Sequence, residues 1–205
     1  MSMRVEPVTL TGKVVRLEPL RLDHAEALCA VGQDASIWRY MPTDPSGSVD
    51  EMRAWITDAL AEREAGRQMP FVTIDLASGD VIGSTRYLTI APRDYGLEIG
   101  WTWLTPRVQR TGANTECKYL LMRHAFETLG AIRVALKTDS RNMVSQRAIE
   151  RLGAVREGVL RKATIIARDG YQRNTVMYSV TDDEWPAVKA RLEGFMREHA
   201  SATGA

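Results

Sequence analysis

The sequence predicts an α+β (mixed α/β) fold: one domain with a mixed, mostly antiparallel central sheet flanked by helices on both faces. Two observations lead to this prediction. Strand-like runs in the middle of the chain are joined by a short polar connection, which is typical of a hairpin, whereas the later strand-like runs alternate with helix-like segments. Further helix-like segments precede the hairpin. Hairpin-connected strands beside helix-connected strands indicate a mixed sheet with helices on its faces.

The N-terminal part of the chain reads as one strand followed by two helices. The apolar run from Val14 to Leu17 predicts the first strand. Asp23 is predicted to cap a helix that carries an apolar stripe at helical spacing. A loop rich in Pro, Gly and Ser (residues 42–48) follows, and the sequence of residues 48–51, Ser-Val-Asp-Glu, is a capping box. It predicts a second helix that ends near Gly66.

The middle of the chain predicts a hairpin and then a further strand. The runs Phe71 to Leu76 and Val81 to Ile90 are separated by a polar connection with a glycine, residues 77–80. The run from Leu97 to Leu104 is the next strand, and its alternation predicts a two-faced element. One face would carry Leu97, Ile99, Trp101 and Trp103, and the other Glu98, Gly100 and Thr102.

The C-terminal part of the chain predicts strands that alternate with helices. Arg133 to Thr138 reads as a strand, and Asn142 is positioned to cap a helix that ends at Gly153. Asn174 to Val180 reads as a late strand. A second capping box, residues 181–184, is predicted to start a C-terminal helix.

Length and composition limit the function classes. A chain of 205 residues fits one domain, expected over residues 1–200, with residues 201–205 as a disordered tail. The net charge of +1 argues against nucleic acid as a partner. Cys29 and Cys117 are expected to be buried, and the scattered histidines offer no ligand pair, so we expect no metal site. No apolar run approaches the roughly 18 residues of a membrane span, and we expect a cytoplasmic protein without a membrane partner.

The stretch from Gln109 to Glu116 carries the strongest functional signal. It lies between a predicted strand and a helix-like run from Cys117 to Leu129. A glycine-containing turn before a helix N-terminus exposes unpaired N–H groups, and the helix dipole adds about half a positive charge there, which favours phosphate. No Gly-Lys-Ser/Thr follows Gly112, which excludes a P-loop, and the absence of GxGxxG removes support for a dinucleotide fold.

This turn resembles motif A of the GCN5-related N-acetyltransferases (GNAT), whose pattern is Gln/Arg-x-x-Gly-x-Gly/Ala. Gln109 and Gly112 occupy the first two fixed positions, and Asn114 stands where Gly or Ala is usual. The order of the predicted elements is also that of the family, so the resemblance covers essentially the whole chain. It implies a single-domain GNAT-like fold that binds acetyl-CoA and needs no metal. The residues that it assigns to the coenzyme are Val108, Gln109, Arg110, Thr111, Gly112, Ala113, Asn114, Thr115 and Asn142.

Residues 142–154 resemble the second conserved block of the same family. Asn142 and Ser145 match the RimJ/RimL-like branch, which acetylates the N-termini of ribosomal proteins. Much of the superfamily places a tyrosine general acid four residues before the glycine, but Ile149 stands there in this chain. Ser145 is then the hydroxyl that could stabilise or protonate the thiolate, with Asn142 beside it. Both residues could instead serve only to cap the helix.

The resemblance also suggests a base and an acceptor site. The strand that contains Glu98 borders the cleft in this family, so Glu98 could accept the amine's proton through water; a solvent-exposed strand glutamate is the alternative. Trp38 and Tyr40 lie in a loop that walls the acceptor site, although such residues can also pack beneath a loop. Arg86 and Tyr87 face opposite sides of their strand, so one of them would point to the cleft.

Taken together, these observations predict an acyl-CoA-dependent N-acetyltransferase that acts by direct transfer in a ternary complex. A non-catalytic coenzyme A-binding or protein-interaction module is the alternative, and a binder of nucleotides or phosphate metabolites is a third. The acceptor is a protein N-terminus or a small-molecule amine, and amino acids, polyamines and aminoglycosides all stay open. Homodimers are common in families of this kind, and a homodimer stays open as well.

Overall fold

A computed structural model describes residues 2–166 and 168–203. These residues form one eight-stranded sheet in the order β1-β2-β3-β4-β5-β6-β8-β7. The strands are β1 (Leu10–Thr11), β2 (Val15–Pro19), β3 (Met69–Asp75), β4 (Val81–Ala91), β5 (Gly96–Leu104), β6 (Arg133–Asp139), β7 (Val155–Ile166) and β8 (Tyr171–Thr181). The helices are α1 (Ala25–Val31), α2 (Ala35–Trp38), α3 (Val49–Glu64), α4 (Ala113–Arg123), α5 (Met143–Leu152) and α6 (Trp185–Thr203). Neighbouring strands are antiparallel except β5 and β6, which confirms the predicted mixed, mostly antiparallel sheet.

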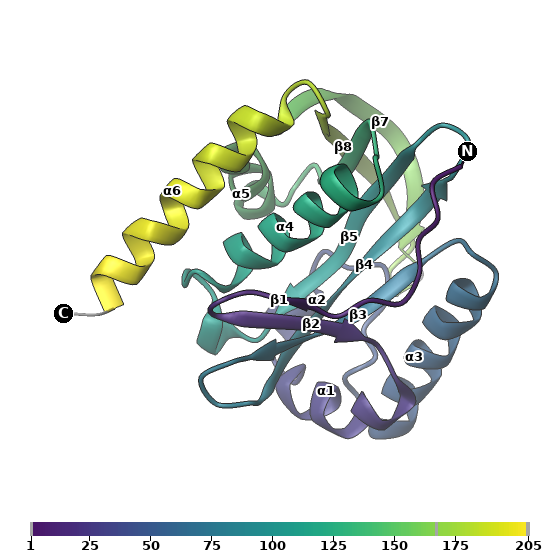
Figure 1. The fold of residues 1–205 in the computed structure, drawn as a ribbon. Helices are drawn as coiled ribbons and strands as arrows, with labels where there is room; N and C mark the ends of the chain where they lie inside the picture. Colours follow the sequence, from purple (N-terminus) through teal and green to yellow (C-terminus); the bar gives the residue numbers. More distant parts are fainter. Residues whose placement is uncertain (1, 167, 204–205) are drawn as a thin grey trace.

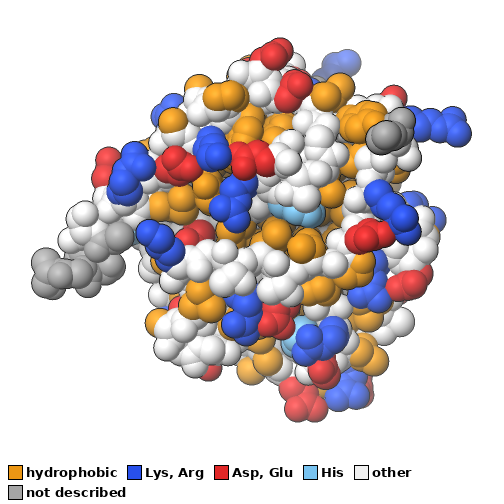
Figure 2. Space-filling model, viewed as in Figure 1, with side chains coloured by type: hydrophobic (Ala, Val, Ile, Leu, Met, Phe, Trp, Pro, Cys, Tyr) orange, Lys and Arg blue, Asp and Glu red, His pale blue; other side chains and the backbone are white. Residues whose placement is uncertain are grey.

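Helices cover both faces of the sheet, as predicted (Figure 1). Helices α4, α5 and α6 pack on one face, where the larger core cluster contains Tyr87, Leu121 and Tyr178. Helices α1, α2 and α3 pack on the other face over a smaller cluster that includes Trp38 and Ile56. Acidic and basic side chains are interspersed over the surface that Figure 2 shows. No helix in the described part of the chain is long and apolar enough to cross a membrane.

Strands β5 and β6 separate soon after they meet. Their parallel pairing consists of Gly96 with Arg133, Leu97 with Val134 and Glu98 with Ala135, although both strands continue beyond these pairs. Beyond these three pairs the two strands diverge and are no longer hydrogen-bonded to each other. Glu98 therefore stands where the two halves of the sheet diverge.

Strand β5 contains a β-bulge at its centre. Ser84 pairs with Trp103 but Arg86 pairs with Gly100, so β5 has one residue more than β4 between these pairs. Trp101 adopts a positive φ of 50° at this point. A bulge of this kind bends the strand and re-aims the side chains that follow it.

The bulge overturns the predicted alternation of β5 beyond Gly100. Leu97 and Ile99 lie in the α4 cluster as expected. Trp101 and Trp103, however, belong to the cluster beneath α1 and α3, and Thr102 faces α4 instead. The inserted residue shifts the period by one, so the two tryptophans change faces.

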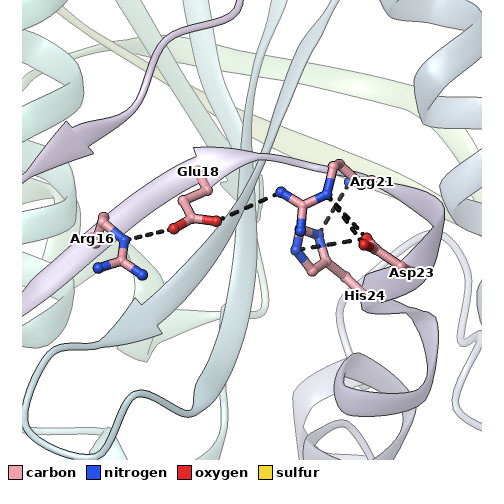
Figure 3. A network of polar contacts seen from close by, with 5 residues as sticks. All are labelled: Arg16, Glu18, Arg21, Asp23 and His24. Carbon is pink, nitrogen blue, oxygen red and sulfur yellow. Dashed lines mark hydrogen bonds and ion pairs between the residues drawn. The ribbon is translucent and has the colours of Figure 1, made fainter.

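The junction between β2 and α1 differs from the prediction. A 3₁₀ turn, η1 (Leu22–His24), precedes α1; its N-cap is Arg21 and the N-cap of α1 is His24, so Asp23 caps neither element. The backbone N–H of Arg21 donates to Nδ1 of His24 at 3.1 Å, while its side chain binds Asp23. Figure 3 shows how Glu18 lies between Arg16 and Arg21 in the same network. The short strand β1, which pairs with β2, was also not predicted.

Other boundaries are closer to the prediction. Ser48 caps α3, because its Oγ accepts a hydrogen bond from the N–H of Glu51 at 3.1 Å. Helix α4 begins at Ala113, before the predicted start, and continues into a π-helical turn, η3 (His124–Thr128). Strand β7 was not predicted at all. Helix α6 continues through Thr203, so residues 201–203 are helical where a disordered tail was expected; residues 204–205 lie outside the described residues.

Candidate functional site

The turn before α4, where an anion cradle was predicted, leads directly into the N-terminus of that helix. A short 3₁₀ turn, η2 (Pro106–Val108), leads into residues 109–112, and Gly112 is the N-cap of α4. The first N–H bond of the helix runs from Glu116 to the carbonyl of Gly112. Amides earlier in the turn therefore have no acceptor within the helix, which is the arrangement that binds phosphate. A Cβ on Gly112 would meet its nearest neighbour, His199, at 3.6 Å.

The side chains of the cradle mostly hold the turn together. Gln109 Nε2 donates to the carbonyl of Leu104 at 3.1 Å, and Thr111 Oγ1 donates to the carbonyl of Val108 at 2.6 Å. The N–H of Ala113 in turn donates to Thr111 Oγ1 at 3.2 Å. The N–H groups of Val108 and Gln109 also donate, to the carbonyls of Thr105 and Pro106, both at 3.1 Å. These bonds set the path of the backbone, and in this described turn the N–H groups of residues 110–112 and 114–115 remain for a ligand.

Glu116 ties the start of α4 to the β1–β2 hairpin. Its carboxylate accepts hydrogen bonds from the backbone N–H groups of Lys13, Val14 and Val15 at 2.8, 2.7 and 2.8 Å. Glu116 is only 4% exposed, and a Cβ on Gly12 would collide with its carboxylate carbon at 2.3 Å. The contact fixes where the cradle sits relative to the sheet.

Glu98 lies on the opposite face of the sheet from α4. Its side chain is buried, Oε2 pairs with Lys137 Nζ at 3.1 Å, and Oε1 is buried without a hydrogen-bond partner. Burial raises the pKa of the carboxyl group, against the lowering effects of Lys137, Arg173 and Lys118. A carboxylate with a raised pKa and a free lone pair is suited to accept a proton near neutral pH. The alternative of a solvent-exposed strand glutamate is wrong, because only 4% of the residue is exposed.

The face around Glu98 is rich in aromatic rings and cations. Arg86 is 4% exposed, and its guanidinium lies 4.2 Å from the ring centroid of Trp55 and 4.9 Å from that of Trp101. Burial lowers the pKa of Arg86 to about 10, against the raising effects of Asp58 and Glu62. A cation held between two indole rings is well stabilised even in a dry environment.

A second group of side chains lies at the end of β6 and at the start of β8. Arg141 stacks on the ring of Tyr171 at 3.4 Å and lies 5.8 Å from the ring of Tyr40. Arg168, from the turn between β7 and β8, donates to the carbonyls of Trp38 and Arg39 at 3.4 and 3.3 Å. These contacts join three segments that are far apart in the sequence: the loop after β6, the β7–β8 connection and the segment around Tyr40.

The start of α5 is built as the sequence predicted. Asn142 is the N-cap, and its Oδ1 accepts a hydrogen bond from the N–H of Ser145 at 3.0 Å. The helix ends at Gly153 in the left-handed conformation with φ of 103°, which glycine adopts without strain. Ile149, at the position of the missing tyrosine, is buried in the core.

A family model matches this sequence and identifies its family. The family model described as "Acetyltransferase (GNAT) domain" matches residues 15–155, which is more than half of the chain. The chain belongs to the GNAT family. The expected resemblance is confirmed, and this GNAT protein is an acyltransferase. No curated protein sequence matches it significantly.

Solved structures support the same assignment. A GCN5-related N-acetyltransferase from Brucella melitensis is 30% identical, with a TM-score of 0.87 over 94% of this chain and 87% of that chain. A T. thermophilus protein assigned as an acetyltransferase is 41% identical, with a TM-score of 0.84 over 94% of this chain and 98% of that one. Mycobacterium smegmatis RimJ, solved in complex with CoA-disulfide, shares the fold at 21% identity, with a TM-score of 0.78 over 94% of each chain.

Two residues expected in the acceptor site of this GNAT protein lie in its cores. Tyr87 points toward α4, where its Oη donates to the carbonyl of Leu121 at 2.6 Å. Trp38 is fully buried, and its Nε1 donates to the carbonyl of Gly32 at 2.7 Å. Of the expected acceptor residues, Arg86 and Tyr40 remain on the face that carries Glu98.

Several residues of the GNAT site had no sequence signal. Lys118 is buried under the bulge, with Nζ 2.7 Å from Thr102 Oγ1, and burial lowers its pKa to about 8. Arg151 donates to Thr115 Oγ1 at 2.8 Å beside the cradle. A surface depression of about 240 Å³ opens next to it, lined by Arg151, Phe195, Glu198 and His199. Among the described residues, no group of three or more His, Cys, Asp or Glu side chains could hold a metal ion.

Proposed function

We propose that this protein transfers an acetyl group from acetyl-CoA to a primary amine, on a protein N-terminus or a small molecule, by direct transfer in a ternary complex. The buried carboxylate of Glu98, with Oε1 unpaired at the point where β5 and β6 separate, is the observation that supports it most. A base at the divergence point of the sheet and an anion cradle before α4 are the two groups that such a transfer needs.

The chain offers a group for each task in the reaction. The turn from Val108 to Thr115 would hold the pyrophosphate and pantetheine through the N–H groups of residues 110–112 and 114–115, since those of Val108, Gln109 and Ala113 already bond within the turn. Asn142 lies at the start of the neighbouring helix. The N–C bond forms as the thioester C–S bond breaks. Glu98 takes the proton of the amine through water, and Ser145 Oγ donates a hydrogen bond to the departing thiolate. RimJ in complex with CoA-disulfide has the same fold, which supports the coenzyme assignment.

The surroundings of Gly112 are compatible with this ligand. A Cβ on Gly112 would meet the side chain of His199 at 3.6 Å, which is ordinary van der Waals contact, so backbone does not crowd this position. Asn114 is partly exposed and replaces a smaller residue of the motif, but the donors are main-chain groups, so binding does not depend on its side chain.

Thermal unfolding with acetyl-CoA, free coenzyme A and ATP tests the donor. Ligand at a hundred times its Kd stabilises a fold by about 2.7 kcal/mol, which is a readable shift. Thiol release in the presence of an amine panel then tests the transfer. Burial raises the pKa of Glu98, so the pH–activity profile should rise at a higher pH than the titration range of an ordinary glutamate. Glu98→Gln should remove this rise.

The outcomes separate the candidate functions. Stabilisation by acetyl-CoA but not ATP, with thiol release that Glu98→Gln and Ser145→Ala reduce, supports the transferase. Stabilisation without turnover on any amine supports a coenzyme-binding module. The proposal is refuted if millimolar acetyl-CoA leaves the unfolding temperature unchanged.

A further inference from the structure

The unpaired polar atoms of this structure gather on one face of the sheet. Seven buried side-chain N or O atoms in the described residues have no hydrogen-bond partner: Trp55 Nε1, Thr73 Oγ1, Arg86 Nε, Arg86 Nη2, Glu98 Oε1, Trp103 Nε1 and Arg173 Nε. All except Thr73 belong to the face that carries Glu98. Buried polar groups are normally satisfied, so such a concentration indicates a place where a polar ligand completes the bonding.

The unpaired atoms on this face are of two kinds, one hydrogen-bond acceptor and several donors. Within this set of described atoms, Glu98 Oε1 is the single acceptor on this face, and the others are N–H donors. A ligand that satisfies them must offer an N–H group to Glu98 and oxygen atoms to the donors. A simple alkylamine provides the first group but not the second.

Arg173 is one of the cations that act on Glu98. On β8, Val176, Tyr178 and Val180 point into the core beneath α4, α5 and α6, so alternation places Arg173 on the opposite face with Glu98. It is only 7% exposed, and its Nε has no partner. Burial lowers the pKa of Arg173, against the raising effects of Asp139 and Glu98.

The carboxylates near Arg173 are already paired with other cations. Glu98 pairs with Lys137, whose side chain is 38% exposed. Asp139 is held by Arg141, with Nη2 2.9 Å from Oδ2 and Nε 3.2 Å from Oδ1. Lys118, which also acts on Glu98, is bound to Thr102 Oγ1. Among Lys137, Arg141 and Arg173, the buried guanidinium of Arg173 is therefore the charge without a dedicated partner in the described residues. Asp169, on the exposed turn after β7, acts on Arg141 and is not among the groups that act on Arg173.

Resting on the proposed acetyl transfer, we propose that the acceptor carries a carboxylate close to its primary amine, and that Arg173 binds this carboxylate while Glu98 faces the amine. A planar guanidinium with free donors is the side chain best matched to a carboxylate. A buried cation that lacks a partner gains more from an anionic ligand than an exposed one does. The free α-amino acid and the acidic first residue of a peptide both present this chemistry.

Matched acceptors test the inference. Thiol release is measured with leucine, leucinamide and isoamylamine, with the corresponding phenylalanine series, and with peptide amides that begin with Asp or Asn. The wild-type protein should prefer the carboxylates over their amides by at least about tenfold in kcat/KM. The free amino acids and the Asp peptide separate the two sources of the carboxylate.

Variants of three arginines locate the binding group. Arg173→Gln should lower kcat/KM for the carboxylates at least about 30-fold and leave the amides within about threefold, because only the charged pair is lost. Arg173→Lys should keep part of the preference. Arg161→Gln, an exposed cation on β7, should change nothing. Unfolding temperature and its shift with acetyl-CoA show that each variant is folded.

Three results would overturn the inference. The first is equal use of amides and carboxylates by the wild-type protein. The second is loss of the preference in Arg86→Gln but not in Arg173→Gln, because it would move the site to β4. Equal loss of both substrate types in folded Arg173→Gln would likewise give Arg173 a structural role only.

Calorimetry separates this inference from the proposed function. Leucine and leucinamide are titrated into the protein saturated with coenzyme A. Binding of leucine that depends on Arg173, without thiol release from acetyl-CoA, would refute the transferase and keep the carboxylate site. Thiol release with no dependence on Arg173 would refute the inference alone.

Discussion

Replacing Glu116 should cost this protein much of its stability. The carboxylate receives three backbone N–H groups of the β1–β2 hairpin, at 2.7 to 2.8 Å, across a separation of more than 100 residues. A hydrogen bond to a charged group contributes about 1.5–3 kcal/mol, and a buried donor left unpaired costs about 1–3 kcal/mol. Val15 is fully buried, so its N–H cannot turn to water, whereas Lys13 and Val14 are exposed.

The expected loss for Glu116→Ala is about 3–5 kcal/mol, since one donor is fully orphaned and two are partly rehydrated. For a domain of this size, each kcal/mol shifts Tm by about 2–4 °C, so Tm should fall by roughly 6–20 °C. Glu116→Gln keeps the shape but sets an amide group against three donors, and we expect about 2–3 kcal/mol. Because the hairpin holds the start of α4, both variants should also weaken acetyl-CoA binding.

Urea and thermal unfolding measure the stability, and the shift with acetyl-CoA reports the cradle. Glu26→Gln is the matched control, because its side chain is 76% exposed and its pair with Arg53 is worth at most about 1 kcal/mol. If Glu116→Gln unfolds within about 1 kcal/mol of the wild type, the three N–H groups do not depend on the carboxylate. The reasoning that links the hairpin to the cradle would then be wrong.

Two further predictions concern Lys118 and Gly100. The pKa of Lys118 falls from 10.5 to about 8 in the folded protein, so between these pH values the unfolded chain binds more protons and stability should rise with pH, by about 2–3 kcal/mol in total. Urea unfolding from pH 7 to 10 measures this effect. Lys118→Met should be more stable than the wild type at pH 7, and its stability should not show the rise with pH. An equal rise in both proteins would contradict the prediction. In Gly100→Ala, a Cβ would lie 3.0 Å from both Glu98 Oε1 and Leu88 Cδ2, so thiol release should fall at least about tenfold while the fold is retained. Unchanged turnover would show that Glu98 does not need its present position.

The features that sequence predicted are those encoded by neighbouring residues. The cap of Asn142 on the N–H of Ser145 and the capping box at Ser48 involve contacts three residues apart, which a short pattern contains. The cradle from Gln109 to Gly112 is likewise a local turn. Fold class followed because hairpins and helical crossovers are distinguished by the connections between the strands.

The features that sequence did not predict depend on distant partners. The bulge in β5 is defined only against the register of β4, so the alternating run around Gly100 concealed an extra residue. Strand β7 is an edge strand whose residues are mostly exposed, so it needs no alternation of apolar and polar side chains. Glu116 gave no signal because its partners are backbone groups, which are the same in every sequence. Arg173 gave none because its neighbours come from other strands.

The bulge also bears on how such a site can arise. If Trp101 were absent, simple alternation would leave Gly100, Thr102 and Trp103 on the faces that they occupy now. The alternation of the other residues of β5 is thus regular, and the bend at the centre of the strand depends on one inserted residue, Trp101, which lies between the paired residues Gly100 and Trp103. A single codon separates a plain strand from the bent one. Folding and chemistry in this sheet could therefore be gained, or lost, in separate evolutionary steps.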